Sequence, residues 1–65
     1  MINDVPAYHK YVTAEKALQK HGFEHKGGNP IDGVRFLSKT HTAIVKLNAP
    51  HRYEVYVYTR RIWAP

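Results

Sequence analysis

The sequence contains no cysteine. Disulfide bonds and thiolate metal sites are therefore excluded, and with them the usual supports of small secreted domains. It also has no apolar run near the roughly 18 residues that a membrane helix needs. The N-terminal residues Met1–Asp4 show neither the basic stretch nor the apolar stretch of a secretory signal. We expect a soluble, cytoplasmic protein with no membrane association.

The chain is short, at 65 residues, whereas a domain usually takes on the order of 100 to 200 residues. We therefore expect residues 1–65 to form a single small domain. Ordering its backbone and side chains costs on the order of 100 kcal/mol, which a core of this size offsets only if nearly all of it is buried. A homodimer is an open alternative, because a second copy would bury further apolar surface.

Acidic residues are few and unevenly placed. Up to Gly33 the sequence has four basic and four acidic side chains, but after Gly33 it has six basic side chains and only Glu54. The whole net charge of +5 thus belongs to the second half of the chain. Such segregation indicates a polyanionic or acidic partner. A solvated basic surface that merely keeps a small domain soluble is the alternative.

The N-terminal region 1–22 has the pattern of a helix. Its apolar face begins at Ala7, and Gly22 stands where a left-handed residue would close a helix that ends near His21. Either Asp4 or Thr13 could cap its start. The residues that recur at alternating steps of four and three are Ala7, Tyr11, Ala14, Leu18 and His21.

The rest of the chain has the pattern of strands and turns. Residues 23–33 predict a short strand, Phe23–Lys26, followed by a loop over Gly27–Gly33. Residues 34–61 predict a basic antiparallel β-meander, and residues 62–65 a tail. Its strands are Val34–Lys39, Ala43–Asn48 and Arg52 to about Arg60. We therefore expect an α+β fold of two layers, with one N-terminal helix packed on a three- or four-stranded antiparallel sheet.

Alternation along these strands predicts which residues form the core. Side chains on one face of a strand recur every second residue. One set is almost wholly apolar and is expected to pack under Tyr11, Ala14 and Leu18 of the helix. That set is Val34, Phe36, Ala43, Val45, Leu47, Tyr53, Val55 and Val57. Trp63 has the same parity, so we expect it to pack on the core as well.

The other set mixes cations with aromatic residues, and the single helix leaves it uncovered. It comprises Arg35, Leu37, Lys39, Ile44, Lys46, Asn48, Glu54, Tyr56, Tyr58 and Arg60. Tyrosine rings stack on bases while Lys and Arg neutralise phosphates, so the sequence predicts a nucleic-acid-binding face that favours single strands. The predicted binding residues are Arg35, Lys39, Lys46, Arg52, Tyr56, Tyr58, Arg60 and Arg61.

Three alternatives to nucleic-acid binding stay open for this face. Tyr, Ile and Leu stabilise a solvated sheet without any ligand. A dimer could bury Leu37, Ile44, Tyr56 and Tyr58 against a second copy. A small protein-binding inhibitor or adaptor could use the same Tyr and Arg residues against an acidic partner protein.

The five histidines raise the question of catalysis or metal binding. His21 and His25 have helical spacing, but Gly22 and Phe23 break the helix between them. Without cysteine and with few carboxylates, we expect no metal and no cofactor. His41 and then His51 would be the candidates in an endoribonuclease. Both fall in short links between strands, where solvated histidines are common, so we expect a protein that is not an enzyme.

Overall fold

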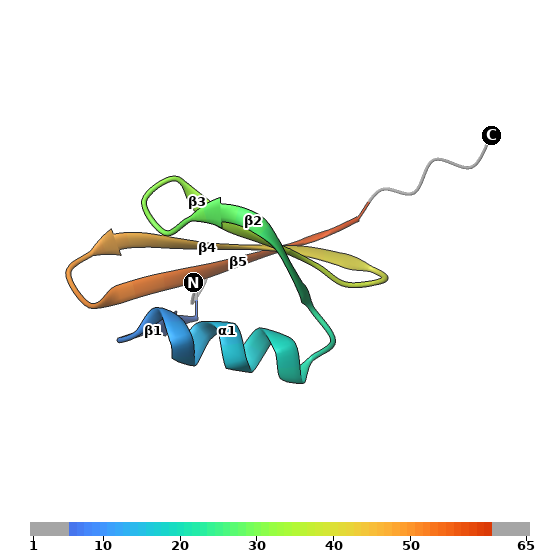
Figure 1. The fold of residues 1–65 in the computed structure, drawn as a ribbon, viewed down its shortest axis with the longest axis horizontal. Helices are drawn as coiled ribbons and strands as arrows, with labels where there is room; N and C mark the ends of the chain where they lie inside the picture. The colour runs from blue at the N-terminus through green and yellow to red at the C-terminus, as the bar shows by residue number, and fades with distance from the viewer. Residues whose placement is uncertain (1–5, 61–65) are drawn as a thin grey trace, which may run out of the picture.

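The computed structural model describes residues 6–60, which form one helix and five strands (Figure 1). In chain order the elements are β1 (Ala7–Tyr8), α1 (Tyr11–Lys20), β2 (Glu24–Asn29), β3 (Gly33–Leu37), β4 (His41–Ala49) and β5 (Arg52–Thr59). Arg61 and Trp63, both assigned roles from the sequence, lie outside the described residues.

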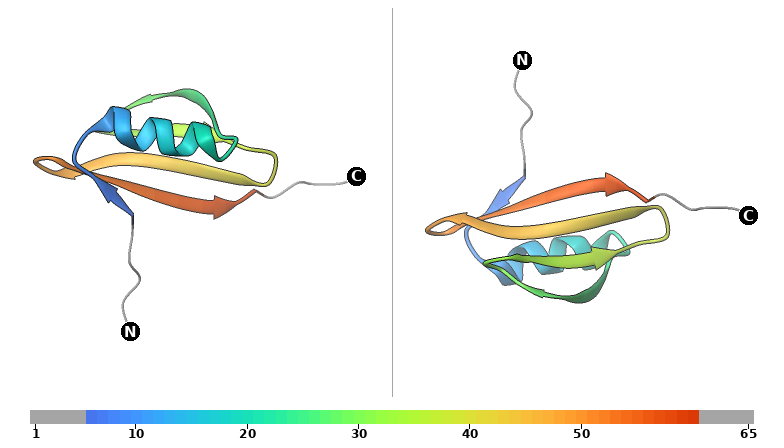
Figure 2. Two further views of the ribbon diagram at one scale, coloured as in Figure 1. Left: turned by 90° about the horizontal axis from the view of Figure 1, so that it is seen from below. Right: turned by 90° about the horizontal axis from the view of Figure 1, so that it is seen from above.

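All five strands belong to one antiparallel sheet with the order β1-β5-β4-β3-β2. The helix α1 lies across one face of this sheet, and no helix or strand of residues 6–60 covers the other face (Figure 2). The predicted α+β architecture is confirmed. The predicted number of three or four strands is wrong, because β1 adds a fifth strand. No helix within residues 6–60 has the length and apolarity to cross a membrane.

The first turn of the predicted helix is a strand instead. Ala7 and Tyr8 pair with Glu54 and Tyr53 of β5, and the carbonyl of Pro6 accepts a hydrogen bond from the amide of Val55 at 2.9 Å. The spacing of Ala7 from Tyr11 fits a helix, but the edge of β5 supplies backbone partners that sequence periodicity cannot reveal.

The helix itself begins at Tyr11, after Lys10, whose side chain makes no capping hydrogen bond. Thr13 therefore lies inside the helix and is not its cap. The predicted end is confirmed. Gly22 has a φ of 87°, and the amides of Gly22 and Phe23 donate to the carbonyls of Gln19 and Leu18, both at 3.0 Å. This is the Schellman arrangement, which satisfies carbonyls that a helix end leaves unpaired.

The segment predicted as a loop from Gly27 to Gly33 is mostly strand. β2 continues through Gly27 and Gly28 to Asn29, with a bulge between His25 and Gly27. Gly28 has a φ of 97°, and a Cβ atom there would lie 2.2 Å from the carbonyl oxygen of Gly33. Glycine is required at this position so that the two backbones can approach, and it does not signal a loop.

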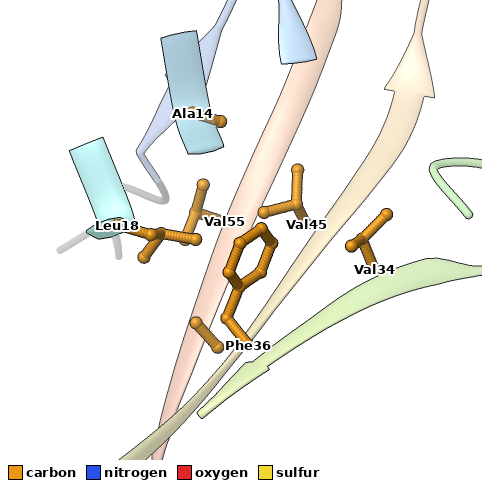
Figure 3. Packing of buried hydrophobic residues seen from close by; sticks show 7 residues of the cluster. Ala14, Leu18, Val34, Phe36, Val45 and Val55 are labelled. Atoms are coloured by element: carbon orange, nitrogen blue, oxygen red, sulfur yellow. The ribbon is translucent and has the colours of Figure 1, made fainter. Parts of the chain in front are cut away.

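The core lies between α1 and the sheet face predicted to be apolar (Figure 3). Five of the eight predicted sheet residues are buried, and Leu47 and Tyr53 are half-buried. Val57 is an exception at 49% exposed, because it lines a groove of about 380 Å³ beside α1 that is not filled. The buried residues are Ala14, Leu18, Val34, Phe36, Ala43, Val45 and Val55.

Candidate functional site

The sheet face opposite α1, called the open face below, carries the predicted mixture of cations and tyrosines. Strand pairing aligns its side chains in rows that run across β3, β4 and β5. The rows are Arg35–Ile44–Tyr56, Leu37–Thr42–Tyr58 and, on β4 and β5 only, Lys46–Glu54. Neighbours in a row have Cβ atoms roughly 5 Å apart, so each row forms a continuous strip of surface.

The two tyrosines of the open face differ in exposure. Tyr58 is 55% exposed, whereas Tyr56 is half-buried. Leu37 and Ile44 are also half-buried, one in each tyrosine's row. The open face therefore has an apolar floor, on which the ring of Tyr58 presents the most accessible aromatic surface.

The predicted cations fall into two groups. Arg35, Lys39 and Lys46 are exposed and form no ion pair with any residue of 6–60. Arg60 donates from Nη1 to the carbonyl of Ser38 at 2.8 Å, which fixes its guanidinium beside the β3–β4 turn. Arg52 Nε lies 2.6 Å from Glu54 Oε2, so the carboxylate neutralises the charge of Arg52.

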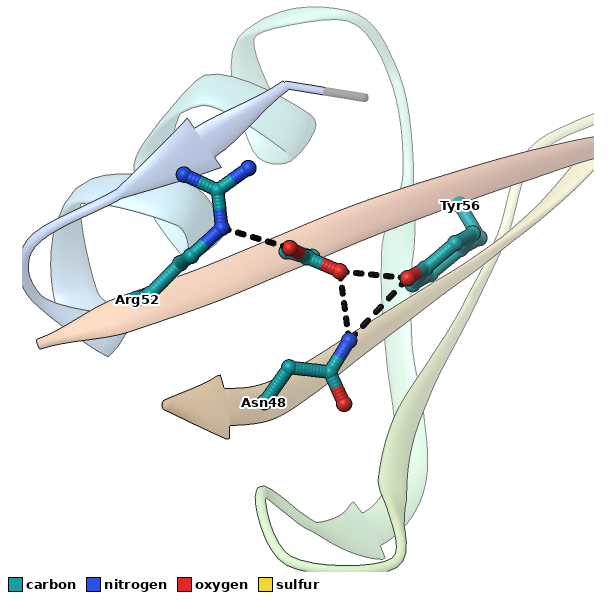
Figure 4. A network of polar contacts seen from close by, with 4 residues as sticks. Asn48, Arg52 and Tyr56 are labelled. Carbon is teal, nitrogen blue, oxygen red and sulfur yellow. Dashed lines mark hydrogen bonds and ion pairs between the residues drawn. The ribbon is translucent and has the colours of Figure 1, made fainter. Parts of the chain in front are cut away.

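Glu54 is the centre of a polar network on β4 and β5 (Figure 4). Its Oε1 accepts hydrogen bonds from the Tyr56 hydroxyl and the Asn48 amide, and its Oε2 accepts one from Arg52 Nε. The Asn48 amide also donates to the Tyr56 oxygen at 3.0 Å. Both carboxylate oxygens are therefore occupied, and the side chains of the three donors converge on one acid.

These hydrogen bonds favour the ionised form of Glu54. The bond from Tyr56, followed by those from Arg52 and Asn48, lowers the pKa of Glu54 from 4.5 to about 2. The same bond to Glu54 is the main reason why the pKa of Tyr56 is raised above its ordinary value of 10.0. At neutral pH Glu54 is thus charged and Tyr56 protonated, so the network holds the Tyr56 ring in one orientation.

β2 contributes a part of the open face that sequence reasoning missed. Gly27 pairs with Arg35, and having no side chain it leaves a hollow of about 410 Å³ next to Arg35, Ile44 and Lys26. The Nζ atom of Lys26 lies 3.2 Å from Oε1 of Glu24, so the two side chains form an ion pair. It also borders a second hollow of about 380 Å³ that reaches Lys39 and Arg60. The loop prediction for Gly27–Gly33 concealed the first of these hollows, which Gly27, Gly28 and Gly33 line.

The candidate catalytic histidines do not share a site. His41 starts β4, with its Nδ1 at 2.7 Å from the Thr40 hydroxyl. His51 lies in the turn at the far end of β4, with a φ of 58° and its ring centroid 6.4 Å from that of His9. Within residues 6–60 no three His, Asp or Glu side chains gather as a metal site would require.

Comparison with known proteins gives no assignment. No family model, curated protein or solved structure matches the chain.

Proposed function

We propose that this protein binds single-stranded nucleic acid, without catalysis, through its open face. One observation carries this proposal: Tyr58 exposes 55% of its surface on the same sheet face as the exposed cations Arg35 and Lys46, which form no ion pair within residues 6–60. Stacking of a base on an aromatic ring contributes about 1 to 3 kcal/mol, and nearby Lys or Arg residues neutralise the phosphates that flank it.

The cations lie on both sides of Tyr58 along the strands. On β5, Arg60 lies two residues after Tyr58. On the other side, Lys46 of β4 lies four residues beyond Thr42, the residue that pairs with Tyr58. A nucleic-acid strand that lies on the open face parallel to β4 and β5 would therefore pass Lys46, the ring of Tyr58 and then Arg60. Tyr56 lies roughly 7 Å from Tyr58 on the same face, and with Ile44 it supports the floor beneath the bases.

The shape of the open face favours single strands over duplexes. A duplex is commonly read by a helix that enters its major groove. The only helix of residues 6–60, α1, lies on the other side of the sheet. A single strand, by contrast, can turn its bases onto a flat surface.

The test compares two neighbouring positions of β5 that point to opposite faces. Tyr58→Ala removes the ring from the open face, and Val57→Ala removes a side chain of similar exposure, 49%, from the helix side. In fluorescence anisotropy with a labelled single strand, Tyr58→Ala should weaken binding about fivefold or more, since stacking contributes about 1 kcal/mol or more. Val57→Ala should leave binding within about twofold of the parent.

Equal affinities for all three proteins would refute stacking on Tyr58. If the parent bound no nucleic acid, the proposal would fail, and an acidic protein would become the better candidate partner for this face.

A further inference from the structure

The hollow next to Arg35 on the open face, called the glycine hollow below, has a volume of about 410 Å³. Three glycines that line it, Gly27, Gly28 and Gly33, leave this space because they have no side chains. The side chain of Ile44 borders it, since its Cγ2 atom would lie 3.0 Å from a Cβ atom at Gly33. The glycine hollow therefore has apolar and backbone surfaces, and its polar side chains come from Lys26, Asp32 and Arg35.

The turn between β2 and β3 fixes Asp32 beside the glycine hollow. Asp32 Oδ2 accepts a hydrogen bond from Asn29 Nδ2 at 3.1 Å, and the amide of Asp32 donates to Asn29 Oδ1 at 2.9 Å. The carbonyl of Pro30, in the same turn, accepts a hydrogen bond from the amide of Leu47 on β4 at 2.8 Å. These bonds hold the turn against the sheet. Asp32 Oδ1 accepts no hydrogen bond from residues 6–60, so the carboxylate can accept further donors.

The charges around the glycine hollow nearly cancel. Lys26 forms an ion pair with Glu24, and the negative charge of Asp32 offsets the positive charge of Arg35. The second hollow of the open face shares that ion pair and has two further cations. Phosphate binding is favoured by an excess of positive charge, as in the second hollow. The glycine hollow suits a neutral group with both donors and acceptors, and in a nucleic acid that group is a base.

We propose that the glycine hollow binds a guanine base of the single strand, an inference that rests on the proposed function. Guanine carries two neighbouring donors, N1–H and the 2-amino group, which one carboxylate can accept together. Asp32 supplies that carboxylate. Guanine also carries two acceptors, O6 and N7, and the Lys26 ammonium can donate to them because its bond to Glu24 uses one of three donors. Arg35 stays available for the phosphate of the same nucleotide.

The other common bases match this combination of groups less well. Cytosine and adenine each offer an amino group next to a ring nitrogen that is an acceptor and repels a carboxylate. Thymine and uracil have a single N–H between two carbonyl oxygens. Guanine is the common base that satisfies the acid and the cation of the glycine hollow at the same time.

The position of the glycine hollow fits the path proposed for the strand. On β4, Ile44 lies between Lys46 and Thr42, the residue that pairs with Tyr58. A nucleic-acid strand that passes from Lys46 to Tyr58 therefore passes the glycine hollow. Arg35 lies two strands and one two-residue step from Tyr58, roughly 12 Å away. One base can thus enter the glycine hollow while another stacks on Tyr58.

The base preference can be measured by fluorescence anisotropy with labelled strands that differ in one base. The first is a strand of thymidines, and the second has guanine at its central position. The parent should bind the guanine strand about fivefold or more tightly than the thymidine strand, the discrimination expected of a bidentate contact. Inosine at the central position lacks the 2-amino group and should lose most of this preference. Inosine binding as tightly as guanine would contradict the contact with the carboxylate.

Two variants with the same loss of charge test the role of Asp32. Asp32→Asn replaces one acceptor by a donor, so it should still bind the thymidine strand but show less than a twofold preference for guanine. Glu24→Gln is the matched control, because Glu24 lies on the open face but does not line the glycine hollow. Its preference for guanine should equal that of the parent. Circular dichroism checks that both variants are folded.

The location can be tested without a strand, by an NMR titration of the parent with guanosine monophosphate and adenosine monophosphate. The guanine nucleotide should shift the amide signals of Gly27, Gly28 and Gly33 more than the adenine nucleotide does. Equal shifts, or shifts only at other residues, would contradict binding in the glycine hollow.

The strand measurements separate this inference from the proposed function. Binding of the thymidine strand with no preference for guanine would overturn the inference and leave the proposed function intact. The inference would also be overturned if Asp32→Asn kept the preference or if Glu24→Gln lost it. Failure of the parent to bind either strand would overturn both.

Discussion

The hydroxyl of Tyr56 donates a hydrogen bond to the carboxylate of Glu54, two residues earlier on the same strand. Glu54 is the single acid among the residues after Gly33. Its charge neutralises Arg52 and holds Tyr56 in place, whereas Tyr58 keeps no such partner among residues 6–60. The two tyrosines therefore have different roles: Tyr56 belongs to the framework of the open face, and Tyr58 is available to a ligand.

The lowered pKa of Glu54 predicts how stability changes in acid. Its folded pKa of about 2 is below its ordinary value of 4.5, so its contribution to stability is complete above about pH 4.5 and is lost as the pH falls through 2. Glu54→Gln removes this titration. The melting temperature of the parent should therefore exceed that of Glu54→Gln at neutral pH, and the gap should shrink as the pH falls.

Thermal unfolding followed by circular dichroism measures this gap. Glu54→Gln changes no other residue, so the contributions of the rest of the chain cancel in the difference. A gap that stays constant down to about pH 2 would show that the network does not stabilise the ionised carboxylate.

The close approach of β2 and β3 predicts unequal costs at two adjacent glycines. A Cβ at Gly28 would lie 2.2 Å from a backbone oxygen, whereas one at Gly27 would meet nothing within 4 Å. Gly27→Ala should cost about 1 to 2 kcal/mol through its positive φ alone. Gly28→Ala should lower the free energy of unfolding, measured in urea, by at least about 1 kcal/mol more than Gly27→Ala, because β2 and β3 must also move apart. Similar losses in both variants would argue against the β2–β3 pairing described here.

The thin core predicts a large effect of a small truncation. Val45 is fully buried in the middle of the sheet, so Val45→Ala should cost about 2 kcal/mol in chemical unfolding from lost methyl groups and the cavity they leave. Val12, on α1, is 47% exposed. Val12→Ala is the control and should change stability by less than about 0.5 kcal/mol, because alanine favours the helix. A larger loss of stability for Val12→Ala than for Val45→Ala would contradict the placement of the core around Val45.

Arg35 is exposed and forms no ion pair among residues 6–60, which predicts a change in the salt dependence of binding. Arg35→Ala should lower the slope of log K against log salt for a single strand by about 0.7, the loss of one phosphate contact. Lys16 is exposed on α1, on the other side of the sheet, so Lys16→Ala should leave the slope unchanged. An unaltered slope for Arg35→Ala, measured by anisotropy over a salt series, would show that Arg35 touches no phosphate.

The sequence predicts the elements whose signals are local. Gly22 fixes the end of α1, and alternation from Val34 onward assigns both faces of β3, β4 and β5. Sequence patterns do not predict the strands that form only because another strand lies beside them. Ala7 and Tyr8 form a strand only because β5 offers an edge, and Gly27 and Gly28 belong to β2 because β3 lies against them.

The same limit applies to the open face. Parity places Arg35, Tyr56 and Tyr58 on one surface, but it treats both tyrosines as equal. The hydrogen-bond network that distinguishes the two tyrosines needs Asn48, which lies at the register shift between Leu47 and Ala49 of β4 and meets Glu54 only in the folded sheet. Lys26 was assigned to the neutral half of the chain, and only strand pairing brings it to the open face.

The most direct test of the proposed function is binding of the unmodified protein to a labelled single strand and to a duplex of matched sequence, by anisotropy at about 50 and 200 mM salt. We predict micromolar or tighter binding to the single strand at low salt, weaker binding to the duplex, and a loss of roughly 20- to 50-fold at the higher salt for three or four phosphate contacts. Absence of binding to the single strand at low salt, or equal binding to both nucleic acids, would contradict single-strand recognition by the open face.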